Sequence, residues 1–194
     1  MVSFPSPFGG SEDDDLFDDR SKFVPDHLPE PNSFLDGQDV RTGQAHVDVH
    51  TVTEELFEER GVYDMTFGYN LARLNLDTRH PDAGYRYAEE ASDPTVLRAE
   101  FTPTTAFCPQ THTLTIGSFR AWNGLSERHD YDLVRVRANP MHHQSESINE
   151  QLAEIEATYL ENGEIADPDQ SVDSSRQGPS FPAEGSTGPQ DAPF

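Results

Sequence analysis

Two segments with alternating polarity, followed by one strongly periodic helix, constrain the fold of this chain most. VLRAEFTP (96–103) and YDLVRVRA (131–138) each place apolar residues on one face of a predicted strand and charged residues on the other. SINEQLAEIEATYLENG (147–163) repeats apolar residues at i, i+4, i+7 and i+11, which predicts a helix. The chain therefore combines strands and helices within one compact stretch.

The elements upstream are predicted from the same kinds of pattern. TVTEELFEERG (51–61) is predicted to be a helix, and YDMTFGYNLARLNLDT (63–78) one long strand or two shorter ones. Residues 79–94 contain two prolines and a glycine and are predicted to be a loop. Residues 109–126 carry apolar residues at helical spacing and are assigned to a helix despite their threonines. Capping boxes and glycine ends are predicted for the two outer helices at Thr51–Glu54 with Gly61, and at Ser147–Glu150 with Gly163.

This order, α-β-β-α-β-α, predicts an α+β fold. Few strands and helices of this length are most economically arranged as a two-layer sandwich, a small mixed sheet covered by helices. The domain is predicted to span residues 45–163. Residues 1–44 are predicted to be a disordered acidic segment, because SEDDDLFDDR is a charge run and several prolines follow it. Residues 164–194 are predicted to be a disordered acidic tail rich in proline, glycine and serine.

The acidic excess extends along the whole chain. The 36 Asp and Glu side chains outnumber the 13 Lys and Arg side chains, Lys22 is the only lysine, and the formal net charge is −23. Residues 45–165 hold 21 acidic and 9 basic side chains, a net −12. At molar salt the Debye length is about 3 Å, which screens such repulsion, so we interpret the charge as a halophilic adaptation. The alternative is an ordinary acidic protein with a partner-binding tail.

The same composition excludes several functional classes. A strongly negative surface repels phosphate, so neither nucleic acid nor an anionic membrane is an expected partner. No run approaches the roughly 18 apolar residues of a membrane helix, and the first residues lack a charged-then-apolar signal pattern. The single cysteine, Cys108, excludes an intrachain disulfide framework. We therefore expect a soluble cytoplasmic protein.

Cys108 is the most informative residue for chemistry. It lies in FTPTTAFCPQTHTLTIG (101–117), between a predicted strand and a predicted helix. Proline suits the first turn of a helix, so Pro109 predicts a helix start with Cys108 facing its free N–H groups. That setting favours the thiolate, the form that attacks electrophiles and binds metals. The alternative is that Cys108 is a small buried apolar residue without chemistry.

An ordered set of motifs surrounds this cysteine. F-T-P-T runs into the cysteine, an I-G pair follows in the next helix, and then come a V-x-V strand, a Pro/His loop and a helix with S-E and N-x-Q-L. The residues that carry these motifs are Phe101, Thr102, Pro103, Thr104, Cys108, Ile116, Gly117, Val134, Val136, Pro140, His143, Ser145, Glu146, Asn149, Gln151 and Leu152. Over residues 95–160 the chain resembles the SufT/PaaD-like iron–sulfur cluster assembly family, which also includes the eukaryotic cytosolic iron–sulfur targeting factor. The resemblance implies an α+β fold, in agreement with the element order above.

The resemblance also implies a non-catalytic carrier or adaptor in which Cys108 is the functional thiol. An iron–sulfur cluster normally takes several thiolates, so Cys108 alone cannot hold one. The candidate further metal ligands are His143 and Glu146, with His112 and His142 proposed by position. His142 competes with His143 for the place of the family histidine. A homodimer would supply two cysteines, and apo iron–sulfur client proteins or other assembly factors would supply ligands of their own, so a cluster or iron is expected only transiently.

Two other functions fit part of the pattern. A Cys–His hydrolase or thiol transferase would use Cys108 with His112 or His143, and it would need an orienting acid as well. An acidic adaptor whose tails bind partners would leave the cysteine inert. Iron-dependent absorbance after anaerobic reconstitution distinguishes the assembly factor from both, and burst kinetics with acyl substrates identifies the enzyme.

Overall fold

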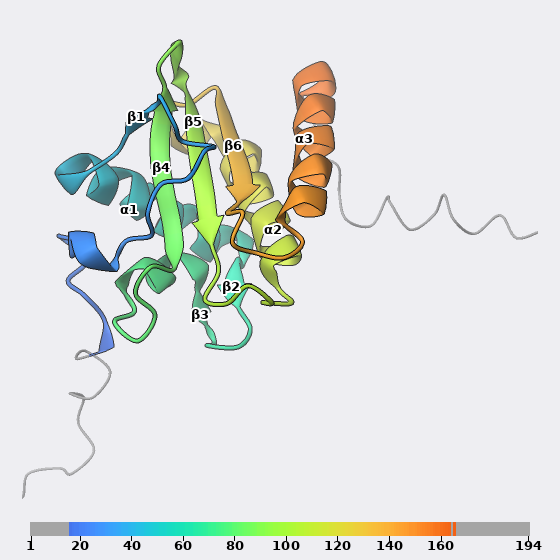
Figure 1. Cartoon of the computed structure of the whole chain (residues 1–194). Helices are drawn as coiled ribbons and strands as arrows, with labels where there is room; N and C mark the ends of the chain where they lie inside the picture. The colour runs from blue at the N-terminus through green and yellow to red at the C-terminus, as the bar shows by residue number, and fades with distance from the viewer. Residues whose placement is uncertain (1–15, 164, 166–194) are drawn as a thin grey trace, which may run out of the picture.

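A four-stranded mixed sheet forms the centre of the computed structural model, which describes residues 16–163 and 165 (Figure 1). The sheet has the strand order β1-β4-β5-β6, with bounds β1 (Asp39–Val40), β4 (Gly84–Glu90), β5 (Asp93–Thr102) and β6 (Leu133–Ala138). β4 pairs antiparallel with both β1 and β5, whereas β5 and β6 are parallel. A parallel pair needs a crossover connection, and helix α2 (Thr111–Gly124) supplies it.

Helices cover the sheet on one side and at one edge. α1 (Gly43–Arg60) and α2 pack behind the sheet, and α3 (Ser145–Asn162) packs against β6 and α2 (Figure 1). A small hairpin of β2 (Tyr63–Asp64) and β3 (Tyr69–Asn70), followed by the 3₁₀ helix Leu71–Leu76, connects α1 to β4. The predicted α+β class is confirmed, and the long elements follow the order α-β-β-α-β-α. Within the described residues, none of these helices is long and apolar enough to cross a membrane.

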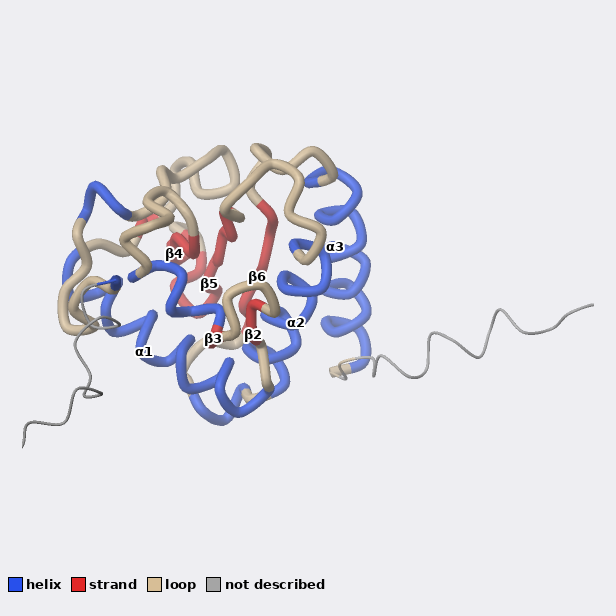
Figure 2. Tube along the Cα trace, turned by 90° about the horizontal axis from the view of Figure 1, so that it is seen from below, coloured by secondary structure: helices blue, strands red, loops and turns tan. Residues whose placement is uncertain are grey.

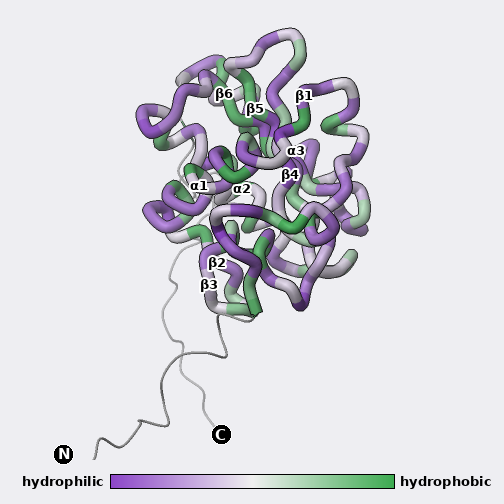
Figure 3. Tube along the Cα trace, turned by 90° about the vertical axis from the view of Figure 1, so that its left-hand side faces the viewer, coloured by the Kyte–Doolittle hydropathy of each residue, from purple (hydrophilic) through white to green (hydrophobic). Residues whose placement is uncertain are grey.

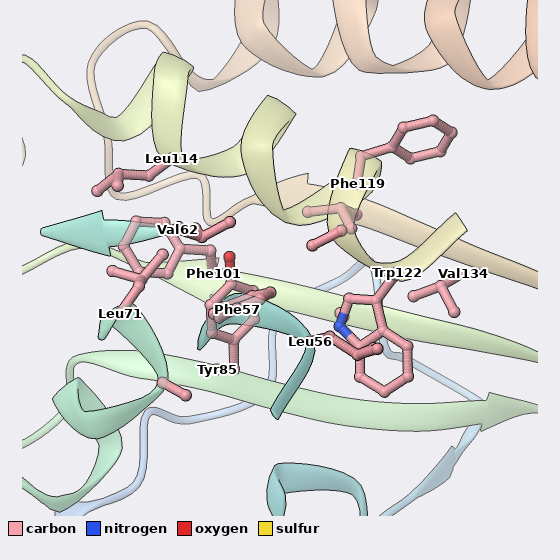
Figure 4. Close-up of a cluster of buried hydrophobic side chains, with 14 of the residues drawn as sticks. Leu56, Phe57, Val62, Leu71, Tyr85, Phe101, Leu114, Phe119, Trp122 and Val134 are labelled. Carbon is pink, nitrogen blue, oxygen red and sulfur yellow. The ribbon is translucent and has the colours of Figure 1, made fainter. Parts of the chain in front are cut away.

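The inward faces of sheet and helices share one hydrophobic core (Figure 4). Both strands predicted from alternation, now β5 and β6, are confirmed, and their alternating apolar residues are buried as expected. Trp122, Tyr85, Phe57 and Phe119 are among the largest fully buried side chains. Burying each such side chain stabilises the fold by about 1.5–3 kcal/mol. The outer loops and helix faces are mostly hydrophilic (Figure 3), which agrees with the acidic composition.

The region between α1 and β5 differs from the prediction. Residues 79–94, predicted to be a loop, contain strand β4. Of the two alternatives for residues 63–78, the structure has the two shorter strands, β2 and β3, and the 3₁₀ helix follows them. The Asn75 side chain helps to hold the start of β4 in place. Its Oδ1 accepts from the Tyr85 N–H at 2.7 Å, and its Nδ2 donates to the Tyr85 carbonyl at 2.8 Å. Gly84 permits this close approach with φ +111°, where a Cβ would lie 2.6 Å from Asn75 Oδ1.

Both predicted capping boxes are wrong, whereas both predicted helix ends are confirmed. α1 begins at Gly43, and Thr51 lies inside it, donating from Oγ1 to the Val47 carbonyl at 2.9 Å. α1 is longer because its buried face continues toward the N-terminus through His46 and His50. α3 begins at Ser145 with Gln144 as N-cap, so its predicted cap Ser147 is already helical. Gly61 and Gly163 end the two helices at φ +67°, a conformation that favours glycine.

Residues 16–40, here called the N-terminal strap, pack on the domain, although the sequence predicted disorder for residues 1–44. Leu28 and Leu35 are buried, and β1 extends the sheet beside β4. The Phe34 carbonyl accepts a hydrogen bond from Arg98 at 2.7 Å. The strap lacks a helical or strand period because its apolar residues pack at different places, Phe17 against Tyr69 and Phe23 against His46. Residues 1–15, 164 and 166–194 lie outside the described residues, so the disorder predicted there stays a prediction.

Candidate functional site

Two loops meet beyond the carboxyl ends of the parallel strands β5 and β6, at the lower end in Figure 1 that Figure 2 views directly. Residues 103–110, here called the Cys108 loop, connect β5 to α2, and residues 139–144 connect β6 to α3. The His143 main-chain N–H donates to the Ala106 carbonyl at 3.0 Å and joins the two loops. Ligands commonly bind at the carboxyl ends of parallel strands, so Cys108 lies where the fold favours a site.

Cys108 is half-buried and lies ahead of α2 rather than on it. The helix begins at Thr111 with Gln110 as N-cap, so the start predicted at Pro109 is wrong by two residues. The Thr111 N–H donates to the Cys108 carbonyl at 3.3 Å, which makes Pro109 the second residue of a β-turn, a position proline also favours. The geometry therefore does not place the thiol on the first free N–H groups of α2, as the sequence argument for a thiolate required.

The two adjacent histidines have different hydrogen bonds. His142 is buried, its Nε2 donates to the Cys108 carbonyl at 3.0 Å, and its Nδ1 accepts from the Gln144 N–H at 3.2 Å. His143 is exposed, and its Nδ1 donates to the Ala106 carbonyl at 2.8 Å. Its Nε2 has no hydrogen-bond partner within residues 16–163 and 165. Of the two, His143 is the one whose ring offers a nitrogen to a metal ion or a proton.

The remaining predicted ligands are not gathered around Cys108 into a closed site. His112 lies exposed on α2, and its Nε2 pairs with Gln151 of α3. Glu146 lies exposed in the first turn of α3. In the described part of the chain, no group of three His, Cys, Asp or Glu side chains is arranged to hold a metal ion. The structure brings Cys108, His142 and His143 together, but it does not build a resident metal centre from the five predicted residues.

Exposed apolar side chains surround the Cys108 loop, a feature that sequence reasoning missed. Phe107 is 74% exposed, Met141 43% and Met65 81%. The rings of Phe107 and His143 lie 4.9 Å apart. The Met65 N–H donates to Oε1 of Gln110 at 2.9 Å, which ties the β2–β3 hairpin to the same loop. Exposed apolar side chains that gather at one place are typical of a docking surface. In the sequence, Phe107 directly before Cys108 was the signal that could have indicated this exposed apolar surface.

A buried carboxylate anchors the 139–144 loop from the other face of the sheet. Glu100 was predicted to lie on the polar face of β5, but the strap covers it and it is only 1% exposed. Its Oε1 accepts from the Asn139 side chain at 3.2 Å and from the Asn32 N–H at 3.1 Å. Burial raises the pKa of Glu100, although these two hydrogen bonds oppose the rise. The Asn139 carbonyl in turn accepts from the His142 N–H at 3.1 Å, which links Glu100 to the candidate site.

Comparison with known proteins gives a family for the domain but no described activity. A domain of unknown function, DUF7998, matches residues 15–166, a stretch that includes the N-terminal strap, the Cys108 loop and all three long helices. No curated protein and no solved structure matches the chain. Since the match covers most of the sequence, the chain belongs to the DUF7998 family.

Proposed function

We propose that this chain delivers iron–sulfur clusters or iron to apo-proteins, as a carrier or adaptor rather than an enzyme. The observation that carries the proposal is the juxtaposition of half-buried Cys108, the available Nε2 of His143 and the exposed ring of Phe107 at one end of the sheet. The resemblance of residues 95–160 to iron–sulfur assembly proteins supports the same thiol. The proposed setting is a cytoplasm of high salt, where the acidic surface is screened.

The cargo would be shared between this chain and a partner. Iron–sulfur clusters usually take four protein ligands, and one thiolate with one imidazole leaves positions open. An apo client protein, another assembly factor or a second copy of this chain would fill them. The exposed side chains of Phe107, Met141 and Met65 would then be covered when the partner docks. In this arrangement His142 is a positioning residue, because it holds the Cys108 carbonyl.

The test is anaerobic reconstitution with ferrous iron and sulfide at molar KCl, followed by transfer of the cluster to an apo-ferredoxin. Wild type is expected to show iron-dependent absorbance and transfer, and Cys108→Ser is expected to lose both. The thermal midpoint of Cys108→Ser should change little, since substitutions at such half-exposed sites usually cost less than about 1 kcal/mol. His143→Gln should slow transfer, whereas His142→Gln should lower the thermal midpoint.

A matched pair of surface variants tests the docking step. Phe107→Ser should weaken capture of apo-ferredoxin, and Leu160→Ser, at an exposed leucine of α3, is the control for loss of apolar surface. Normal transfer by Cys108→Ser would overturn the proposal. A burst of product from acyl substrates that depends on Cys108 would replace it with a thiol enzyme.

A further inference from the structure

A cavity lies between the N-terminal strap and the start of α1, and no residue of the Cys108 loop lines it. Its volume is about 400 Å³, and residues from the strap, α1 and β4 line it. This size is within the range of small-ligand pockets. The 3₁₀ helix Pro25–His27 and the start of α1 lie at the left of Figure 1, on the side of the sheet opposite α3. Buried Leu28 and Val47 form apolar parts of the wall.

Arg86 of β4 lines this cavity without a counter-ion. It is half-buried, its Nε is buried without a hydrogen-bond partner, and it forms no ion pair within residues 16–163 and 165. Burial lowers the pKa of Arg86, and Glu30 opposes this only from beyond ion-pair distance. Other arginines on the same sheet, Arg98 and Arg137, do pair with carboxylates. An arginine that lines a cavity and has no carboxylate partner among the described residues can pair with an anionic ligand.

His46 adds a second group without a partner. Its side chain is fully buried, it forms part of the cavity wall, and neither ring nitrogen has a hydrogen bond among the described residues. A buried polar group without a partner costs about 1–3 kcal/mol, so such groups usually have a ligand or water. Burial lowers the pKa of His46 to about 3. At neutral pH the ring is therefore uncharged and offers one donor and one acceptor.

The start of α1 adds unpaired main-chain N–H groups to the wall of this cavity. Thr42 and Gly43 line the cavity, no side chain caps the helix, and its first turn contains no acidic residue. The first N–H groups of an uncapped helix, with the positive end of its dipole, attract anions. Lys22, the only lysine of the chain, also lines the cavity. Four independent donors or cations therefore surround one space.

We propose that this cavity binds a small molecule through an anionic group, a phosphate or a carboxylate, held by Arg86, His46 and the first N–H groups of α1. Asp26 and Glu30 also line the cavity, but both are exposed. They lie toward the solvent, where salt screens them, and they suit a polar or cationic part of the same molecule. The inner groups then select the anion and the outer carboxylates select the rest of the ligand.

The experiment titrates the full chain with inorganic phosphate or with acetate at constant ionic strength in KCl, so that chloride is the competing blank. The ring ¹⁵N signals of His46 are followed by NMR. A saturable shift of these signals with phosphate or with acetate supports the site, and the stronger of the two identifies the anionic group. No saturable shift with either anion overturns the proposal, and so does phosphate binding that leaves the His46 signals unmoved.

Variants assign the binding to the cavity. Arg86→Gln should weaken binding by about tenfold or more, the effect of removing one charged hydrogen-bond donor. Arg120→Gln is the matched control, because Arg120 also has a buried Nε without a partner but lines a different cavity. Arg86→Lys keeps the charge and should retain part of the affinity if Arg86→Gln fails to fold. Equal affinity in Arg86→Gln and Arg120→Gln overturns the assignment.

Discussion

Two buried histidines of α1 should make the domain lose stability on mild acidification. His46 and His50 lie one helical turn apart, and the Phe23 ring contacts both, with centroids 4.6 Å from each. Burial lowers the pKa of His46 to about 3, with His50 and Arg86 adding to the effect. Burial also lowers the pKa of His50 to about 4, although the hydrogen bond from its Nε2 to the Ala72 carbonyl opposes the shift.

The direction and size of the effect follow from proton linkage. In the unfolded chain both histidines take up a proton as the pH falls below 6.5, whereas in the folded domain they do so only near pH 4 and 3. Above pH 6.5 both rings are neutral in the folded and the unfolded chain, and stability is complete. As the pH falls from 6.5 toward the folded pKa values, the unfolded chain binds protons that the folded domain does not, and stability is lost. Each proton changes the free energy of unfolding by about 1.4 kcal/mol per pH unit. Between pH 7 and 5 the loss is about 2 kcal/mol for each histidine and about 4 kcal/mol for both, a large share of an ordinary domain stability of about 5–15 kcal/mol.

The assay is urea unfolding at constant molar KCl, at several pH values between 7 and 5. The double variant His46→Phe/His50→Gln removes both titrating rings, and the glutamine keeps an N–H for the Ala72 carbonyl. Carboxylates titrate in both proteins and cancel in the difference, so the variant should lose about 4 kcal/mol less than wild type over this range. His112→Gln, at an exposed position, controls for the loss of an imidazole. Equal losses in wild type and double variant would refute the reasoning.

Three further predictions test other parts of the structure. Lowering the salt from molar KCl to dilute buffer should lower the thermal midpoint, because the net −12 of residues 45–165 is then unscreened; a midpoint that does not change with salt contradicts the halophilic interpretation. Glu100→Gln should raise stability at pH 7, because burial raises the pKa of Glu100 and its ionisation then costs folding free energy. The gain in stability should shrink at pH 4, and a variant that is less stable than wild type at pH 7 would contradict the prediction. Gly84→Ala should cost about 3 kcal/mol in chemical unfolding, because φ is +111° and the new Cβ would meet Asn75 Oδ1; a cost below about 1 kcal/mol would show that β4 adjusts easily.

Alternation and helical periodicity predicted the elements that have one buried face. β5, β6 and α3 were found because each presents a regular apolar face to the core. β4 was missed because the glycine and prolines around it were interpreted as loop signals, although Tyr85 and Tyr87 alternate and are fully buried. The strap was missed because single apolar residues that pack at different places leave no period in the sequence.

The candidate site was predictable in place but not in detail. Cys108 was located from its position between a strand and a helix, and the structure brings the two histidines to it. Which histidine has a ring nitrogen available to a ligand depends on hydrogen bonds to main-chain carbonyls of the Cys108 loop, more than 30 residues earlier in the chain. No sequence pattern predicts such hydrogen bonds. The cavity of Arg86 and His46 was not found either, because it requires the strap that the sequence had assigned to disorder.

The strap also determines the order in which the domain can be completed during synthesis. Asn32 contacts Glu100 and Phe34 contacts Arg98, across 68 and 64 residues of chain. The strap is synthesised before β4 and β5, yet it cannot dock until both strands have emerged and paired, and closing such long loops is slow. Its few aliphatic residues and its charge limit premature collapse in the meantime. The strap therefore docks only after the strands that it covers have paired, so substitutions in the strap should speed unfolding more than they slow folding.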